Sequence, residues 1–166
     1  MEWCCLVSEQ ITEVRELAIA VFASSGRLIA TGNERVAHLG LTSAWWQVLG
    51  ALRYSPVPLP TASIARNMGL TRQAVQRIVD LLAERGMVAF EDNPHHRRAK
   101  LVVLTREGLA AVTSAEQAVA TLDREIADRI GRERIKDATR ILGEMNAILT
   151  EWLDRTEASP SPNNAS

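Results

Sequence analysis

With 166 residues the chain is long enough to bury an ordinary hydrophobic core, so folding requires neither disulfides nor a structural metal. Apolar residues make up 46% and charged residues 23%, as is typical of a soluble globular protein, and no apolar stretch approaches the length of a membrane span. The net charge of −1 argues against a nucleic-acid partner, but residues 61–106 carry eight basic against four acidic side chains. We therefore expect one cytoplasmic domain, with no membrane partner and a basic central module.

The two cysteines, Cys4 and Cys5, are adjacent, which gives neither a disulfide framework nor the spacing of metal ligands. His38, His95 and His96 do not complete a metal site with them. The chain also lacks a nucleophile motif and a glycine-rich phosphate loop. We expect no metal, no cofactor and no enzymatic activity. A disulfide across a dimer, acting as an N-terminal redox switch, stays open as an alternative.

The first elements in chain order are two helices and a connector. Apolar residues at helical spacing predict a first helix from Ser8, as its N-cap, to about Thr31, with Gly32 ending it. A second helix should begin after Thr42. Residues 55–60 contain three prolines and cannot be helical, because proline lacks the backbone donor and restricts the residue before it. They predict a stiff connector.

Two short helices, 61–67 and 71–85, are expected next, and Gly86 should end the second. Two short strands, 87–90 and 99–104, are rich in apolar and β-branched residues and flank a polar stretch. They predict a β-hairpin with a long tip.

The remainder of the chain predicts two more helices and a tail. Thr105 should cap a long helix with Glu107 in its first turn, where the helix dipole favours an acid, and Gly131 should end it. A last helix follows with an apolar stripe. Residues 156–166 are rich in Ser, Pro and Asn and are expected to be disordered.

Residues 61–78 have the spacing of a helix-turn-helix. Ala65 is small where the two helices must approach closely, and Gly69 occupies the turn, where a positive φ is easiest for glycine. Four apolar residues should complete the small core: Ile64, Leu70, Val75 and Ile78.

The second helix of this motif turns amide and basic side chains outward. Arg bonds guanine and Gln bonds adenine in the major groove of DNA. Arg72 and Gln73 are the expected base readers, Gln76 is next, and Arg77 reads a base or holds a phosphate. The hairpin tip adds a basic finger along the duplex. The expected DNA contacts are Ser63, Thr71, Arg72, Gln73, Gln76, Arg77, His96, Arg97 and Arg98. The alternatives are a solvated helix face and a winged-helix module that binds protein.

The stretches TRQAVQRIVDLLAERGMV (71–88) and RRAKLVVLT (97–105) resemble the MarR family of bacterial regulators, and the resemblance covers residues 8–153. It implies a mostly α fold with a small β-hairpin wing. It implies dimerisation segments at residues 8–31 and 106–153. Between them, residues 42–105 should form a DNA-binding winged helix-turn-helix lobe. It also implies a homodimer that binds the half-sites of a pseudo-palindromic double-stranded operator, by default as a repressor.

One wing position departs from the family. Arg98 matches the family's minor-groove arginine, but His96 stands where the family usually has an aspartate that orients it. Arg98 therefore lacks that partner unless Glu91 or Asp92 substitutes. A histidine close to a polyanion gains a proton and adds positive charge.

The resemblance further implies a small aromatic or phenolic effector in a crevice between the dimerisation helices and the lobe. The candidate lining residues are Phe22, His38, Trp45, Trp46 and Tyr54. Core packing is the alternative for each of them. Ala18 aligns near the position of the reactive cysteine of peroxide-sensing members, so that mechanism is not expected.

Overall fold

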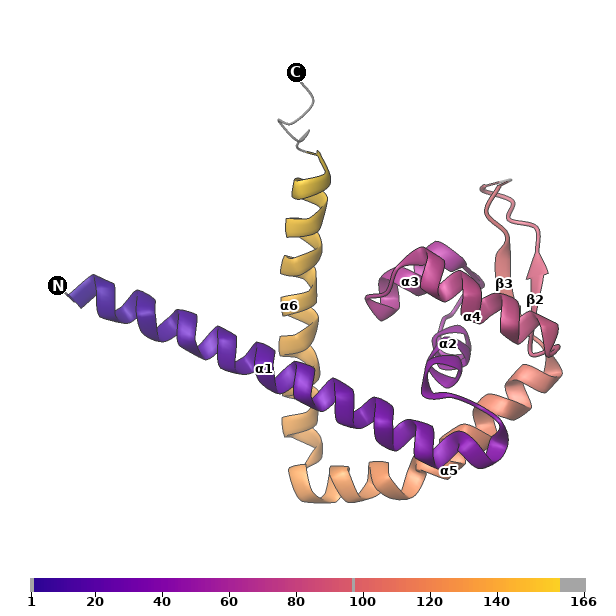
Figure 1. Cartoon of the computed structure of the whole chain (residues 1–166), viewed down its shortest axis with the longest axis horizontal. Coiled ribbons are helices and arrows are strands. Elements are labelled where there is room, and N and C mark those ends of the chain that lie inside the picture. The colour runs from indigo at the N-terminus through magenta and orange to yellow at the C-terminus, as the bar shows by residue number, and fades with distance from the viewer. Residues whose placement is uncertain (1, 97, 159–166) are drawn as a thin grey trace. The chain divides into compact units, whose positions relative to one another are not determined.

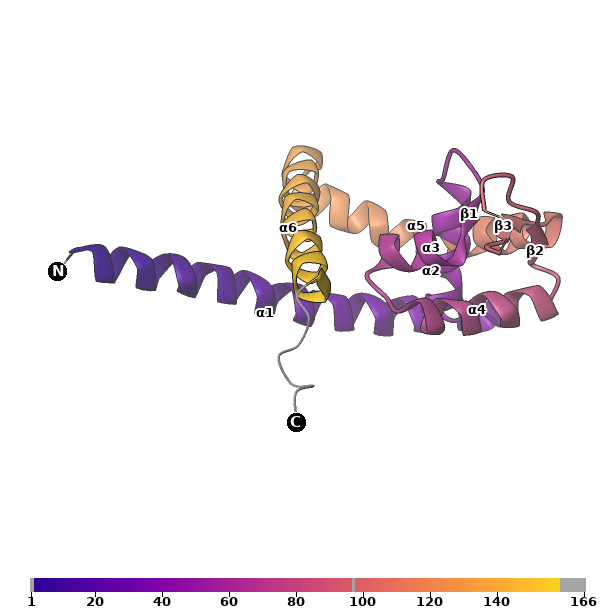
Figure 2. The ribbon, with the colours of Figure 1, turned by 90° about the horizontal axis from the view of Figure 1, so that it is seen from above.

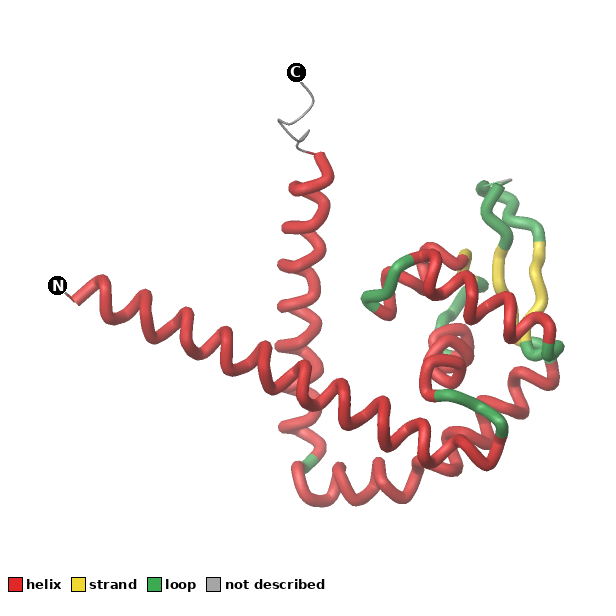
Figure 3. The backbone as a smooth tube through the Cα atoms, viewed as in Figure 1, coloured by secondary structure: helices red, strands yellow, loops and turns green. Residues whose placement is uncertain are grey.

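The computed structural model describes residues 2–96 and 98–158, with side chains from Ile11 to Arg155. The chain divides into two compact units, with the boundary between Ala120 and Thr121. The elements in chain order are α1 (Glu2–Val36), η1 (Ala37–Leu39), α2 (Ser43–Arg53), β1 (Leu59–Pro60), α3 (Thr61–Met68), α4 (Arg72–Glu84), β2 (Val88–Glu91), β3 (Leu101–Leu104), α5 (Arg106–Ile130) and α6 (Arg132–Ala158). Figure 1 labels the six α-helices and the two strands of the hairpin. Helices dominate, and the strands are confined to one small sheet (Figure 3). The predicted fold class is confirmed.

Helix α1 is longer than predicted at both ends. Ser8 lies inside it, and Gly32 does not end it. Gly32 is buried, and a Cβ at this position would lie 2.9 Å from the Ser43 hydroxyl, so the glycine serves a close approach of α1 to α2. The chain turns instead after η1, where Gly40 adopts a φ of +67°.

Helix α2 begins where the sequence predicts. The Thr42 hydroxyl accepts a hydrogen bond from the Trp45 backbone N–H at 3.2 Å, which is the geometry of an N-cap. The Ser43 N–H, one residue later, donates to Asn33 Oδ1 at 2.7 Å and ties the start of α2 to α1.

The sheet has three strands, in the order β1-β3-β2, with both pairs antiparallel. The predicted hairpin is confirmed as β2 and β3, but the prediction missed β1, which ends the proline-rich connector. Two residues, Leu59 and Pro60, pair with Val102 and Leu101. Proline has no N–H to donate, so it is tolerated at a sheet edge, which is where β1 lies. The pairing ties the start of α3 to the wing.

The core of the first unit is assembled from the end of α1, the loop before α2, helices α2, α3 and α4, strands β2 and β3, and the first part of α5. Its buried apolar residues are Val36, Leu41, Val48, Leu49, Ile64, Ala65, Val75, Val79, Leu82, Val88, Val102, Val112, Ala115 and Val119. Leu70 was expected in this core but is 44% exposed. It lies in the turn, immediately before the N-cap of α4, so α4 does not carry it inward.

The start of α5 is locked to the wing by Thr105, as its predicted capping role requires. Its hydroxyl accepts from the Gly108 N–H at 3.0 Å and donates to the Gly86 carbonyl at 2.6 Å. Gly108 approaches the wing so closely that a Cβ there would lie 1.9 Å from the Met87 carbonyl oxygen.

The second unit contains the last part of α5 and all of α6. Gly131, with a φ of +89°, separates the two helices as predicted. Helix α6 continues to Ala158, so the predicted disorder from residue 156 was wrong for three residues, and residues 159–166 lie outside the described part of the chain. Within the described residues no helix is long and apolar enough to cross a membrane.

Candidate nucleic-acid interface

The helix-turn-helix forms as its sequence predicts. Ala65 is 3% exposed at the crossing of α3 and α4, and Gly69 has a φ of +63°. The Leu70 N–H donates to the Ala65 carbonyl at 3.0 Å, which closes the last turn of α3. The turn fixes the direction in which α4 leaves.

Helix α4 separates its faces sharply. Val75, Val79 and Leu82 are buried against the core. Arg72, Gln73 and Arg77 are exposed, and their side chains form no hydrogen bond or ion pair with any other described residue. Their donors are therefore available to an outside partner.

The remaining predicted contacts on this motif are already engaged or partly covered. Thr71 is the N-cap of α4, and its hydroxyl accepts from the Ala74 N–H at 3.2 Å. The Gln76 amide donates to Asp80 Oδ1 at 2.8 Å, so it must leave that carboxylate before it bonds a base. Ser63, on α3, is half-buried.

The wing tip is built from two successive turns. Asn93 Oδ1 accepts from the His95 N–H at 2.9 Å, and the Asn93 carbonyl accepts from the His96 N–H at 3.2 Å. The His96 carbonyl in turn accepts from the Ala99 N–H at 3.0 Å. The backbone of His96 is thus held on both sides, while its side chain is exposed.

Of the two predicted wing arginines, Arg98 is exposed, whereas Arg97 lies outside the described residues. Arg98 forms no ion pair with a described carboxylate, so neither Glu91 nor Asp92 takes the place of the aspartate that His96 replaces.

A groove of about 720 Å³ separates α4 from the wing. It brings together four predicted DNA contacts, Arg72 and Gln76 from α4 and His96 and Arg98 from the wing. Sequence reasoning missed Lys100, which lies in the same groove two residues after Arg98. The basic charge of Lys100 within the predicted wing could have identified it as a further DNA contact. The remaining lining residues are Pro60, Thr61, Ala62, Phe90, Asn93 and Ala99.

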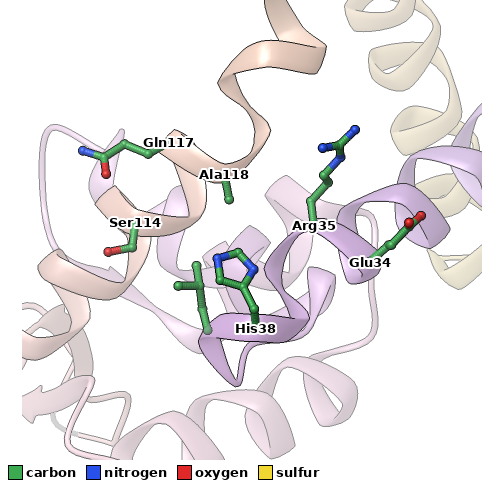
Figure 4. Close-up of a pocket in the computed structure, with 7 residues that line it drawn as sticks. Glu34, Arg35, His38, Ser114, Gln117 and Ala118 are labelled. Carbon is green, nitrogen blue, oxygen red and sulfur yellow. The ribbon is translucent and has the colours of Figure 1, made fainter.

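A second pocket, of about 660 Å³, lies between the end of α1 with η1 and the first part of α5. His38 is the one predicted effector-pocket residue in its lining, and its imidazole faces the side of α5 that carries Ser114 and Ala118 (Figure 4). Glu34 and Arg35 from α1, Leu39, and Gln117 from α5 complete it.

The other four candidates do not line this pocket. Trp45 lies under the Arg85 guanidinium, 4.2 Å from the ring centroid, and Trp46 packs beside Gly32. Phe22 is 76% exposed on α1. Tyr54 is exposed and belongs to a polar cluster described next.

The polar cluster joins the end of α2 to α5. The Tyr54 hydroxyl donates to Glu116 Oε1 at 2.6 Å, and Arg53 forms an ion pair with the same carboxylate at 3.4 Å and donates to the Thr113 hydroxyl at 2.7 Å. The hydrogen bond to the Glu116 carboxylate is the main cause that raises the pKa of Tyr54 above its ordinary 10.0. The residues that this polar cluster joins are about 60 positions apart, so no local pattern in the sequence predicts the cluster.

Cys4 and Cys5 lie within α1, but their side chains are outside the described part of the chain. Their predicted alternative role as a redox switch stays untested.

Comparison with known proteins identifies the fold. Residues 39–99, which span α2 to the wing, match the model of the MarR family. The protein Rv2011c of Mycobacterium tuberculosis is 32% identical over 118 residues, which cover 71% of this chain and 81% of that protein. CouR of Rhodococcus jostii bound to p-coumaroyl-CoA superposes with a TM-score of 0.70 at 22% identity, over 78% of this chain and 91% of CouR.

The transcriptional repressor CouR bound to a 23-mer DNA duplex superposes with a TM-score of 0.66 at 27% identity, over 80% of this chain and 94% of the repressor. The family match covers the helix-turn-helix and most of the wing, and these are the elements whose local geometry the sequence predicted. The chain belongs to the MarR family of winged-helix transcriptional regulators.

Proposed function

We propose that this regulator is a cytoplasmic homodimer that binds a pseudo-palindromic DNA operator and represses transcription until an effector releases it. The observation that carries the proposal is the exposed polar face of α4, with unpaired arginines, beside a basic groove and wing. The repressor CouR, which shares the fold at 27% identity, forms a complex with duplex DNA and supports this reading.

In the proposed complex α4 enters the major groove. Arg72 and Gln73, in its first turn, read bases, and Gln76 joins them once it leaves Asp80. Arg77 lies one turn further along and contacts a base or a phosphate. Arg98 enters the minor groove, where the negative potential favours an arginine. The supporting contacts are Ser63, Thr71, His96 and Arg97.

The homodimer is supported by apolar side chains that each unit leaves in water. In the first unit, the N-terminal part of α1 extends away from the lobe in both Figures 1 and 2, and Ile19 and Phe22 on it are more than 60% exposed. In the second unit, α6 exposes Ile148, Leu149 and Leu153. Exposed apolar surface of this kind marks an interface, and a second copy of the chain would bury it.

The effector site is proposed at the pocket that contains His38. Its volume of about 660 Å³ lies within the range of small-molecule sites, and Arg35 and His38 are suited to an acidic group on an aromatic ligand. CouR, bound to p-coumaroyl-CoA, supports an effector of this kind. Aromatic carboxylic acids should lower the fluorescence anisotropy of the protein–DNA complex. His38→Ala should weaken that response and leave DNA binding intact; an unchanged response would place the effector elsewhere.

The function as a whole is tested by fluorescence anisotropy on DNA from the gene's own upstream region and on a random duplex, at about 50 and about 200 mM salt. We expect tight binding to one fragment, a steep loss with salt, and a footprint that spans two half-sites. Weak and equal binding to both duplexes, together with no site in a selection from genomic DNA, would reject the proposal in favour of a protein-binding module.

A further inference from the structure

The charged side chains that line the groove between α4 and the wing are all basic. Arg72 faces it from α4, and Arg98 and Lys100 face it from the wing. No carboxylate lines it, and among the described residues none of these three cations forms an ion pair. The start of α3 contributes no charged side chain to the lining. Such a groove suits an anion.

The position of the groove indicates which anion it takes, if the proposed function holds. When α4 enters the major groove and the wing tip enters the minor groove, the backbone strand that separates these two grooves must pass between α4 and the wing. The groove of about 720 Å³ lies in that place. A phosphodiester of the operator is therefore the ligand whose chemistry and location both fit.

His96 also lines this groove, whereas the adjacent histidine, His95, does not. His95 is also exposed on the wing tip. The backbone of His96 is fixed by the bonds from its N–H to the Asn93 carbonyl and from the Ala99 N–H to its own carbonyl. His96 therefore lines the groove together with three cations, and a phosphodiester that enters the groove places negative charge beside the imidazole, which favours its protonated form.

We propose that this groove seats a phosphodiester of the bound operator through Lys100 and that His96 takes up a proton from solvent as the DNA enters, so that operator affinity rises as the pH falls. The inference rests on the proposed function. In the proposed complex the neutral imidazole of His96 becomes an imidazolium beside the phosphate. Histidine is the side chain whose charge changes most readily around neutral pH, so a linkage through it acts within the physiological range.

The first test is operator affinity of the full chain at constant ionic strength, from about pH 8.5 to about pH 5.5, by fluorescence anisotropy. A tenfold difference in proton affinity between free and bound protein gives about a tenfold gain in operator affinity over this range. We expect a gain of this order for the natural protein and for His95→Asn, the matched control, and a flat profile for His96→Asn. A flat profile for the natural protein, or an equal gain in His96→Asn, overturns the proton linkage.

A second measurement counts protons directly. Isothermal titration of operator in two buffers that differ in ionisation enthalpy should report net proton uptake at neutral pH for the natural protein and His95→Asn, and close to none for His96→Asn. Uptake that persists in His96→Asn assigns the proton to another group and rejects the proposal.

The phosphate seat is tested separately by Lys100→Ala. Loss of one phosphate contact should reduce the slope of log affinity against log salt by about 0.9, equally on operator and on random duplex. An unchanged slope removes Lys100 from the seat. Failure of the natural protein to bind any duplex at any pH would reject the proposed function itself, which separates that result from a failure of the pH linkage alone.

Discussion

At the scale of single residues, the first turn of α4 combines one engaged side chain with two that are free. The Thr71 hydroxyl holds the Ala74 N–H and fixes where the helix begins. Arg72 and Gln73 follow at once and make no bonds within the described chain, so their orientation is set by the helix alone. A side chain at the start of a recognition helix is well placed to reach base edges.

Replacement of Arg72 tests whether it reads a base. Arg72→Ala should cost about 1–3 kcal/mol on the operator and much less on a random duplex, because a bidentate bond to guanine is lost. Arg72→Lys keeps the charge without the two-pronged geometry, so it should restore binding to random DNA but not discrimination. Anisotropy on both duplexes measures this. Equal losses on the two duplexes would make Arg72 a phosphate contact.

The Tyr54–Glu116 hydrogen bond can be tested by titration of the Tyr54 phenol. The pKa of Tyr54 is raised in the folded protein, so this hydrogen bond stabilises the folded state at neutral pH. The stabilisation is lost as the pH rises through the raised pKa, because a phenolate has no proton to donate. Tyr54 is the chain's single tyrosine, so phenolate absorbance reports it alone. Glu116→Ala removes the acceptor, which is the principal cause of the shift, and should move the titration midpoint of Tyr54 down towards 10.0 in the folded protein. An unchanged midpoint would show that the bond does not persist in solution.

At the scale of elements, the wing and α5 meet at a single tight junction. The Met87 carbonyl accepts from the Thr105 N–H at 3.1 Å, and the Gly108 backbone lies against the same carbonyl. The Thr105 hydroxyl adds its bond to Gly86. The start of β2, the end of β3 and the first turn of α5 are thereby fixed to one another.

This junction predicts that Gly108 tolerates no side chain. In Gly108→Ala the methyl group would overlap the Met87 carbonyl, and the strain of moving that backbone, about 1–3 kcal/mol, exceeds the gain of up to about 1 kcal/mol that alanine brings to a helix. Urea denaturation should show a lower midpoint. Gly50→Ala, in α2 with no atom within 4 Å of the new Cβ, is the matched control and should be neutral or stabilising. A Gly108→Ala protein as stable as the natural one would refute the overlap.

An element could be predicted from the sequence where the residues that determine it lie close together in the chain. The caps formed by Thr42 and Thr105 and the turn at Gly69 involve residues within four positions and could be predicted, whereas the bond from Thr105 to Gly86 spans 19 positions and could not. The prediction that Gly32 ends a helix is wrong because a glycine that ends a helix and a glycine that allows a close approach have the same sequence pattern, and the neighbour here, Ser43, is known only from the fold. Strand β1 depends on β3, some forty residues later, and two residues of strand carry no periodicity.

The candidate site follows the same rule. The outward face of α4 was predicted by helical spacing, and the structure places Arg72, Gln73 and Arg77 on an exposed surface as expected. The groove that adds Lys100 could not be predicted, since it depends on how the wing packs beside α4. The effector residues predicted from the sequence are aromatic, whereas the pocket that contains His38 is lined mainly by polar side chains.

At the scale of the whole molecule, each unit retains apolar surface that its own fold does not bury. The exposed apolar residues of α1 and α6 lie on helices, and helices in proteins gain most of their stability by packing an apolar face against other elements. A partner that covers them would contribute to folding as well as to operator geometry, so the concentration of the protein should affect its apparent stability.

The dimer is tested by one charge on α6. Leu149→Glu places a carboxylate in the proposed apolar interface and should shift the protein to monomers in analytical ultracentrifugation, with loss of operator binding. Ala147→Glu adds the same charge two positions earlier, on the opposite side of the helix, and should leave the dimer intact. A dimeric, operator-binding Leu149→Glu protein would show that another surface forms the interface.

The three unbonded side chains on the outer face of α4 have a consequence for how such a regulator diversifies. Arg72, Gln73 and Arg77 make no side-chain bonds within the described chain, so substitutions there should change folding stability by no more than about 0.5 kcal/mol. After duplication of the gene, a copy could exchange these residues and acquire a new operator while the lobe folds as before. Binding specificity is thereby free to drift independently of the scaffold, and a designer who grafts another reading face onto α4 inherits the same freedom.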